Sequence, residues 1–169
     1  MTALNINDMV FFEYPETMNF RTRRKLRWKQ KSKILHTDIV FSISNFTKKE
    51  IVECIGIPES KIVSVPLSIN TDRFHTGHSS EEMERTRKKY HIPKMYFLYV
   101  GTLEPRKNIE RLLDAYAILL KNRIDAPVLV IAGKKGWLYN AIFDEVQRLH
   151  LENHVLFTGY VEENEVPLL

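Results

Sequence analysis

Short apolar runs alternate with longer amphipathic stretches through the second half of this 169-residue chain. The apolar runs predict strands at Met95–Val100, Val128–Ala132 and Val155–Thr158, and the stretches between them predict helices at Asn108–Asn122 and Asn140–His150. Such alternation is typical of βαβ units, in which each helix returns the chain to the same edge of the sheet and makes successive strands parallel. We therefore predict an α/β fold with a parallel sheet.

The first half follows the same scheme with shorter elements. Its predicted elements are strands at Ala3–Ile6, Asp38–Ser42 and Lys61–Val65, a helix at Phe20–Leu35 with Leu26, Trp28 and Ile34 toward its buried side, and a helix from the N-cap Ser44 to Gly56. The other expectations are a break at Tyr14-Pro15-Glu16, a connection at Pro66–Ser80, a charged helix at Glu81–Tyr90 and a helix start at Glu163–Leu169.

Composition excludes several classes of protein. Hydrophobic residues make up 44% of the chain and charged residues 27%, which is typical of a globular domain rather than a disordered or fibrous chain. No apolar run approaches the roughly 18 residues of a spanning helix, so the sequence predicts no membrane span. Cys54 is the single cysteine, which excludes an internal disulfide and a multi-cysteine metal site and suits a reducing compartment. We therefore expect a cytoplasmic protein.

Basic residues are concentrated in one segment, residues 21–33. This segment holds eight of the 25 Lys and Arg residues and no acid, so the remainder has 17 basic and 21 acidic residues and a net charge of −4. A basic patch of this kind can face anionic lipid, a phosphorylated substrate or nucleic acid, or it can be a solvated helix face. The charge pattern alone leaves these interpretations open.

Glycine and cationic residues follow the predicted strands of the second half. The residues after the three strands are, in order, Gly101 with Arg106 and Lys107; Gly133 with Lys134; and Gly159 with Tyr160 and Val161. Ligands of open parallel sheets bind beyond the carboxyl ends of the strands, and glycine lets them approach the backbone closely. The third loop has no charge, so it could flank a base, or it could be an ordinary turn. With Asn108 as a predicted N-cap of the following helix, Gly101, Arg106 and Lys107 suit a diphosphate. A solvent-exposed basic turn is the alternative.

Several familiar motifs are absent from the sequence. It has neither the G-x-G-x-x-G dinucleotide fingerprint nor the G-x-x-x-x-G-K-[ST] phosphate loop, and it has no Asp-x-Asp pair for a metal-bound nucleotide. His75 and His78 have a spacing that can bind a metal, but the sequence offers no nearby third ligand, and we prefer a linker. Cys54 is interpreted as a buried core thiol. We therefore predict no metal site.

Three ordered motifs resemble those of the group 1 (family 4) retaining glycosyltransferases. They are residues 99–108 (YVGTLEPRKN), 129–133 (LVIAG) and 155–161 (VLFTGYV). Residues 43–49 (ISNFTKK) and 61–66 (KIVSVP) resemble upstream parts of the same family, so the resemblance covers nearly the whole chain.

The resemblance implies a GT-B fold of two Rossmann-like domains, which transfers a sugar from a nucleotide diphosphate sugar to a glycan or lipid-linked acceptor with retention of configuration. It assigns residues 1–66 to the acceptor-side domain, 67–80 to the connection and 81–169 to the donor-side domain. It implies that Arg106 and Lys107 are catalytic and bind the donor together with Gly101, Gly133, Lys134, Gly159, Tyr160 and Val161. It also implies a reaction without metal or cofactor.

On the acceptor side, the resemblance places Asn7 and Asp8, and we expect the basic segment 21–33 to face an anionic membrane surface at the inner face of the membrane. The family often has His-Asp where this chain has Asn7-Asp8, and asparagine cannot take a proton.

The family's E-x7-E motif does not occur, so we expect a fragment of such an enzyme that is inactive alone. The alternatives are a non-catalytic nucleotide- or phosphosugar-binding module and, third, a nucleic-acid-binding domain, for which the sequence has no motif. The oligomeric state is left open.

Overall fold

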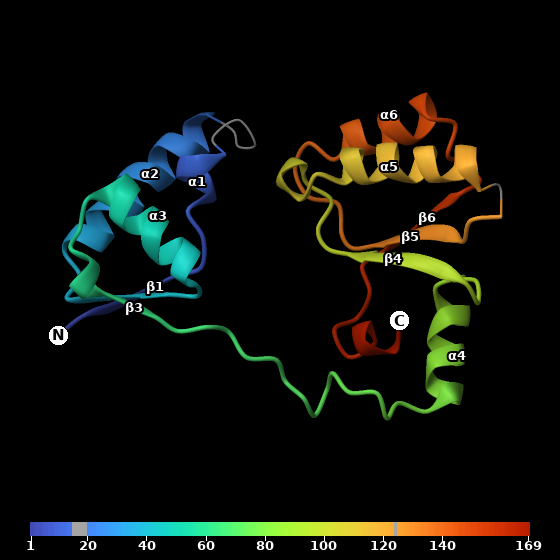
Figure 1. Cartoon of the computed structure of the whole chain (residues 1–169), viewed down its shortest axis with the longest axis horizontal. Helices are drawn as coiled ribbons and strands as arrows, with labels where there is room; N and C mark the ends of the chain where they lie inside the picture. The colour runs from blue at the N-terminus through green and yellow to red at the C-terminus, as the bar shows by residue number, and fades with distance from the viewer. Residues whose placement is uncertain (15–19, 124) are drawn as a thin grey trace. The chain divides into compact units, whose positions relative to one another are not determined.

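The computed structural model describes residues 1–14, 20–123 and 125–169. These residues form two compact units, Met1–Ile69 and Asn70–Leu169. Each unit has its own parallel sheet and its own apolar core, which confirms the predicted α/β class with parallel strands (Figure 1).

The first unit is a layer of helices on a parallel sheet. Its strands β1 (Ala3–Ile6), β2 (Ile39–Ser42) and β3 (Ile62–Ser64) are hydrogen-bonded in that order, and its helices are α1 (Val10–Glu13), α2 (Phe20–Leu35) and α3 (Asn45–Ile55). The helices lie on one side of the strands (Figure 1). A short 3-10 helix, η2 (Glu59–Lys61), leads into β3. The core between the layers consists of Ile6, Met9, Phe11, Ile34, Val40, Ile51, Ile55, Ile57 and Ile62.

Both ends of α3 are where the sequence predicts them. The hydroxyl oxygen of Ser44 accepts a hydrogen bond from the Thr47 backbone N–H at 3.0 Å, which satisfies a donor that the first helical turn leaves free. Gly56 ends the helix with a φ of +83°, a left-handed conformation that glycine adopts without steric cost.

The basic helix α2 has the predicted bounds but only part of the predicted buried side. Ile34 is buried in the core, as predicted, whereas Trp28 is 74% exposed. The indole shares its face of the helix with exposed Arg24, Lys25 and Lys31, three or four residues away, and this charged face is solvated. The predicted burial of the Leu26 side chain and the predicted break at Pro15-Glu16 lie outside the described residues.

In the second unit, helices lie on both sides of a parallel sheet. Strands β4 (Tyr96–Val100), β5 (Val128–Ala132) and β6 (Val155–Gly159) are hydrogen-bonded in that order. Helices α5 (Ile109–Asn122) and α6 (Asn140–Arg148) cover one side, and α4 (Ser80–Lys89) and the 3-10 helix η4 (Val166–Leu168) lie on the other (Figure 1). The core under α5 and α6 consists of Leu103, Ile109, Leu113, Tyr116, Ala117, Leu129, Ile131, Ile142, Val146 and Leu151.

The connection between the two sheets and the residues after β6 have local features of their own. Residues 65–79 have no helix or strand, and α4 then begins in a capping box in which Ser79 and Glu82 bond each other's backbone N–H. The predicted helix start at Glu163–Leu169 is wrong. Residues 163–165 form a turn that is followed by η4, in which Pro167 suits a first helical turn because it has no N–H to leave unpaired. Among the described residues, no helix is both long and apolar enough to cross a membrane.

Candidate functional site

The predicted glycines lie together at the carboxyl edge of the second sheet. The Gly101 N–H donates to the Ala132 carbonyl at 2.9 Å, and the Gly133 N–H donates to the Gly159 carbonyl at 2.8 Å. The pairing continues past the first strand end, where the Leu103 N–H donates to the Lys134 carbonyl at 3.0 Å. The loops after β4 and β5 are therefore held side by side by backbone hydrogen bonds.

Gly133 is required by the close approach of two backbones. Its φ is +157°, and a Cβ built on it lies 1.9 Å from the Gly101 carbonyl oxygen. No side-chain rotation can relieve a contact with main-chain atoms, so only glycine lets the β5 loop lie against the β4 loop.

A pocket of about 190 Å³ opens at this edge. It is lined by Val100, Gly101, Thr102, Ala132, Gly133, Lys134, Tyr160, Val161, Glu163 and Val166. The structure thus brings together the predicted donor residues Gly101, Gly133, Lys134, Tyr160 and Val161. Gly159, Arg106 and Lys107 are not among the lining residues. Sequence reasoning missed Thr102, Glu163 and Val166; their closeness to the strand-end glycines was the available signal.

Arg106 is held by a buried carboxylate that the sequence did not reveal. Its Nε lies 2.6 Å from Oε1 of Glu104, whose side chain is 3% exposed. The contact is an ion pair without hydrogen-bond alignment, since this buried oxygen has no hydrogen-bond partner. Burial, and then the negative charge of Glu104, raise the pKa of Tyr99 in the preceding strand. The Arg106 guanidinium therefore has a carboxylate partner within its own loop.

The segment after Arg106 differs from the predicted helix start. The 3-10 helix η3 (Pro105–Lys107) precedes α5, and Lys107 is exposed on it. Asn108 adopts a left-handed conformation with φ +53°, and its side chain makes no capping hydrogen bond. Asn108 is therefore the N-cap residue of α5, as predicted, but without a side-chain hydrogen bond, because the tight η3 turn places it outside the extended conformation that a capping side chain needs.

The two neighbouring lysines after Gly133 have different surroundings. Lys134 lines the pocket. The Lys135 ammonium lies over the rings of Tyr139 and Phe143, 4.9 and 5.0 Å from their centroids, which is a cation–π arrangement. Lys134 is therefore the cation of this pair that lines the pocket.

The predicted acceptor-side residues lie in the first unit, after β1. Asn7 and Asp8 are exposed, and the Asn7 side-chain oxygen accepts from the Asn5 amide at 2.9 Å. Asp8 accepts from the Val10 N–H at 3.3 Å at the start of α1. Both side chains thus have local structural partners.

The remaining candidates have local partners as well. The rings of His75 and His78 stack with centroids 4.0 Å apart, and the described residues contain no group of three or more His, Cys, Asp and Glu arranged to hold a metal. Cys54 is partly buried rather than in the core, and its thiol donates to Glu13 at 3.2 Å. Burial and the adjacent Glu13 raise the pKa of the Cys54 thiol to about 11, so it is a weak nucleophile at neutral pH.

Comparison with known families decides the class of this chain. Residues 82–169, just over half of it, match the family described as glycosyl transferases group 1. The chain belongs to this family. The match covers α4, the sheet of the second unit and the pocket at its edge.

Relatives of this group 1 glycosyltransferase support the assignment. The chain is 31% identical over 170 residues to the O-antigen chain mannosyltransferase B of Escherichia coli, a match that covers 96% of this chain and 42% of that protein. The chain thus spans less than half the length of this relative.

Solved structures share the GT-B fold. The Anabaena protein Alr3699/HepE, in complex with UDP and glucose, superposes with a TM-score of 0.74 at 18% identity, covering 98% of this chain and 42% of that one. WaaG, a glycosyltransferase involved in lipopolysaccharide biosynthesis, superposes with a TM-score of 0.70 at 15% identity, covering 99% and 47%. At these identities the likeness shows the fold alone.

Proposed function

We propose that the protein is a nucleotide-sugar-dependent glycosyltransferase and that the pocket at the strand ends of the second unit binds its donor. The observation that carries the proposal is the convergence of Gly101, Gly133 and Lys134 on one pocket, which combines close backbone approach with a cation. Membership of the group 1 family supports sugar transfer. The UDP and glucose complex of Alr3699/HepE, which shares the fold, supports a nucleotide sugar as donor.

The cations of the site have a defined task in such a reaction. Negative charge develops on the leaving diphosphate as the bond to the sugar breaks, and fixed cations stabilise that charge. We assign the first contact to Lys134, because it lines the pocket. Arg106 and Lys107 are the further proposed catalytic residues, with the Glu104 carboxylate beside the Arg106 guanidinium. In this proposal protein cations neutralise the diphosphate, and neither metal nor cofactor is needed.

Donor binding is the direct test, because it requires only the pocket of the second unit. UDP, GDP and ADP, with their glucose and mannose conjugates, are titrated into the full chain by calorimetry, with and without EDTA. We expect one nucleotide series to bind and EDTA to leave its affinity unchanged. A charge-assisted hydrogen bond is worth about 1.5–3 kcal/mol, so Lys134→Met is expected to weaken binding about 10- to 100-fold.

Lys135→Met is the matched control. It removes the same charge one residue away, but from an ammonium that lies over Tyr139 and Phe143 rather than in the pocket. We expect affinity close to that of the unmodified protein. Equal effects of the two substitutions, or no binding of any nucleotide by the folded chain, would overturn the proposal.

The sugar and the acceptor are proposed at a coarser level. The mannosyltransferase relative supports a hexose such as mannose. We propose that this sugar is transferred with retention to a glycan or lipid-linked acceptor, as the resemblance to the family implies. Asn7 and Asp8 are proposed to lie on the acceptor side. We further propose that the protein acts in the cytoplasm, with the exposed Arg24, Lys25 and Trp28 of α2 against anionic lipid at the inner face of the membrane. Co-sedimentation with neutral and anionic liposomes tests this, and equal recovery with both would refute it.

A further inference from the structure

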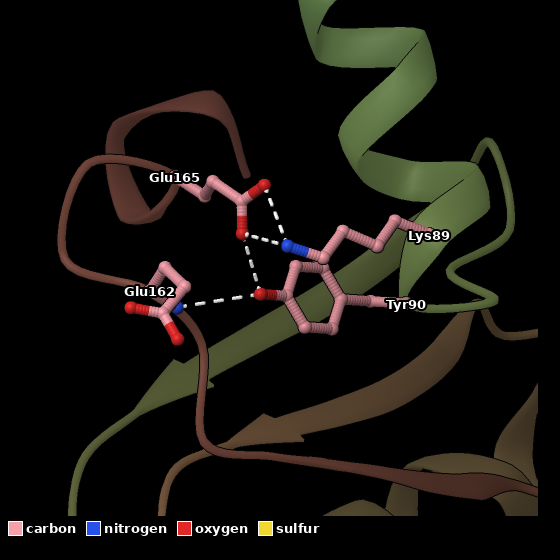
Figure 2. Close-up of polar contacts among 4 residues, drawn as sticks. All are labelled: Lys89, Tyr90, Glu162 and Glu165. Carbon is pink, nitrogen blue, oxygen red and sulfur yellow. Dashed lines mark hydrogen bonds and ion pairs between the residues drawn. The ribbon is translucent and has the colours of Figure 1, made fainter.

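One side of the pocket, residues 160–166, is tied to the end of α4 by side chains that the proposed function does not use. Lys89, the last residue of α4, places its ammonium 2.7 and 2.8 Å from the two carboxylate oxygens of Glu165. The Tyr90 hydroxyl donates to Glu165 at 2.6 Å and lies 3.3 Å from the Glu162 backbone N–H, from which it accepts. Figure 2 shows the Lys89 and Tyr90 side chains pointing toward the Glu165 carboxylate, with the Glu162 backbone N–H bonded to the Tyr90 hydroxyl. We call these four residues the Glu165 anchor.

The hydrogen bonds of the anchor stabilise the charged forms of both Glu165 and Lys89. Hydrogen bonds from Lys89 and then Tyr90 lower the pKa of Glu165, and the hydrogen bond to Glu165 raises the pKa of Lys89. Both shifts favour the charged pair. Lys89 also lies at the C-terminal end of α4, where a cation is favourable beside the helix dipole. The pair is therefore formed at neutral pH.

The anchored segment, which we call the pocket wall, contributes directly to the pocket. The wall residues that line the pocket are Tyr160, Val161, Glu163 and Val166. The Glu162 carbonyl accepts from the N–H groups of Glu165, at 2.8 Å, and Val166, at 3.2 Å, so residues 162–166 of the wall form a closed turn. Because the turn is closed, a shift of Glu165 is transmitted to Val166 in the pocket lining.

A second contact reaches the same wall from outside α4. Arg73 lies 3.4 Å from the Glu163 carboxylate. Its position is in turn supported by His78, whose ring nitrogen lies 3.2 Å from the Arg73 carbonyl. The wall is thus held from the 70–90 segment at both Glu163 and Glu165, and the Glu165 contacts are the shorter of the two sets.

We propose that Lys89, Tyr90 and Glu165 are positioning residues for the donor: they hold the wall at the distance from Gly101 and Gly133 that lets the donor contact both sides of the pocket. This inference rests on the proposed function, because it takes the pocket as the donor site. The anchor residues do not line the pocket themselves. Their effect on the donor is therefore exerted through the wall, and it is measured as donor affinity.

The test uses the full chain and the nucleoside diphosphate that binds best among UDP, GDP and ADP. Glu165→Gln removes the charge that both Lys89 and Tyr90 bond, and Tyr90→Phe removes the hydroxyl while keeping the ring. A net hydrogen bond is worth about 1 kcal/mol, so we expect each substitution to weaken binding by at most about fivefold, since the bond is also present without the donor. Tyr90→Phe is the milder change and keeps the test available if Glu165→Gln reduces folding.

Lys88→Met and Lys89→Met are the matched pair. Both lysines are exposed and adjacent on α4, but Lys88 pairs with Glu84 within the helix at 3.6 Å and does not contact the wall. Lys89→Met is expected to weaken nucleotide binding and Lys88→Met to leave it unchanged. The charge swap Lys89→Glu with Glu165→Lys is expected to restore part of the affinity, because it re-forms the ion pair with the charges exchanged.

A double-mutant cycle separates positioning from general destabilisation. Glu165→Gln and Tyr160→Ala act on the same wall, so their effects on affinity are expected to be non-additive, whereas Glu165→Gln and Lys134→Met are expected to add. Wild-type affinity in Glu165→Gln, Tyr90→Phe and Lys89→Met would overturn the inference while leaving the donor site intact. Failure of the unmodified chain to bind any nucleotide would instead overturn the proposed function.

Discussion

Replacing Gly133 with alanine tests the backbone packing on which the candidate site depends. The added Cβ would lie 1.9 Å from the Gly101 carbonyl oxygen and 2.7 Å from its carbon, at a φ of +157°. A residue held in so sparsely populated a conformation costs of order 1–3 kcal/mol, and forcing extra volume into a packed site costs about 1–3 kcal/mol more. We therefore expect the free energy of unfolding to fall by about 2–6 kcal/mol, out of the 5–15 kcal/mol typical of a domain.

Gly159→Ala is the control at the same sheet edge. Gly159 also has a positive φ, +74°, but no atom lies within 4 Å of its added Cβ. Its substitution carries the conformational cost alone, about 1–2 kcal/mol. Urea unfolding of both variants, followed by circular dichroism with the m-value compared, measures the difference. Equal losses in the two variants would refute the close approach of the β4 and β5 loops.

Three further predictions concern other parts of the chain. Ser79→Ala removes the capping box of α4 and is expected to lower the free energy of unfolding by about 1 kcal/mol in urea; an unchanged midpoint would contradict this. Tyr116→Phe removes a hydroxyl that donates to the Pro127 carbonyl at 2.8 Å, with an expected loss of about 1–2 kcal/mol in the same assay. Because burial and Glu13 raise the pKa of Cys54 to about 11, the protonated thiol stabilises the fold fully below pH 9.0, and that contribution is lost as the pH rises through about 11. Iodoacetamide is expected to react quickly only in that alkaline range, and rapid alkylation at neutral pH would contradict the shift.

The elements that the sequence predicts well are those with a strong local signal. The apolar run Val128–Ala132 is a strand with the predicted bounds, and Phe20–Leu35 is a helix with the predicted bounds. In both cases composition over a short window decides the backbone state. The predicted burial of Trp28 is wrong because a helix with so many charged residues has no clear apolar face from which to assign a buried side.

The candidate site likewise contains residues that local sequence features predict and contacts that only the folded structure reveals. Gly101, Gly133 and Lys134 could be found from sequence, because glycine and charge directly after an apolar run are local features. The Glu104–Arg106 pair could not, since burial of the carboxylate depends on how the loop folds. In the Glu165 anchor, Glu165 contacts Lys89 and Tyr90, which precede it by 76 and 75 positions in the sequence. Only the folded second unit brings these residues together.

The two sides of the pocket are therefore held by different kinds of contact, so substitutions on the two sides have different effects. The side formed by Gly101 and Gly133 is held by main-chain hydrogen bonds at the sheet edge, so substitutions there act through steric overlap and stability. The side formed by residues 160–166 is held by Lys89 and Tyr90 on Glu165, so substitutions there change a small number of side-chain contacts. We therefore expect variation at the wall to change the fit of the proposed donor with a smaller loss of stability than variation at the glycine edge. The wall and its anchor are the part of the site in which we expect donor preference to be tuned.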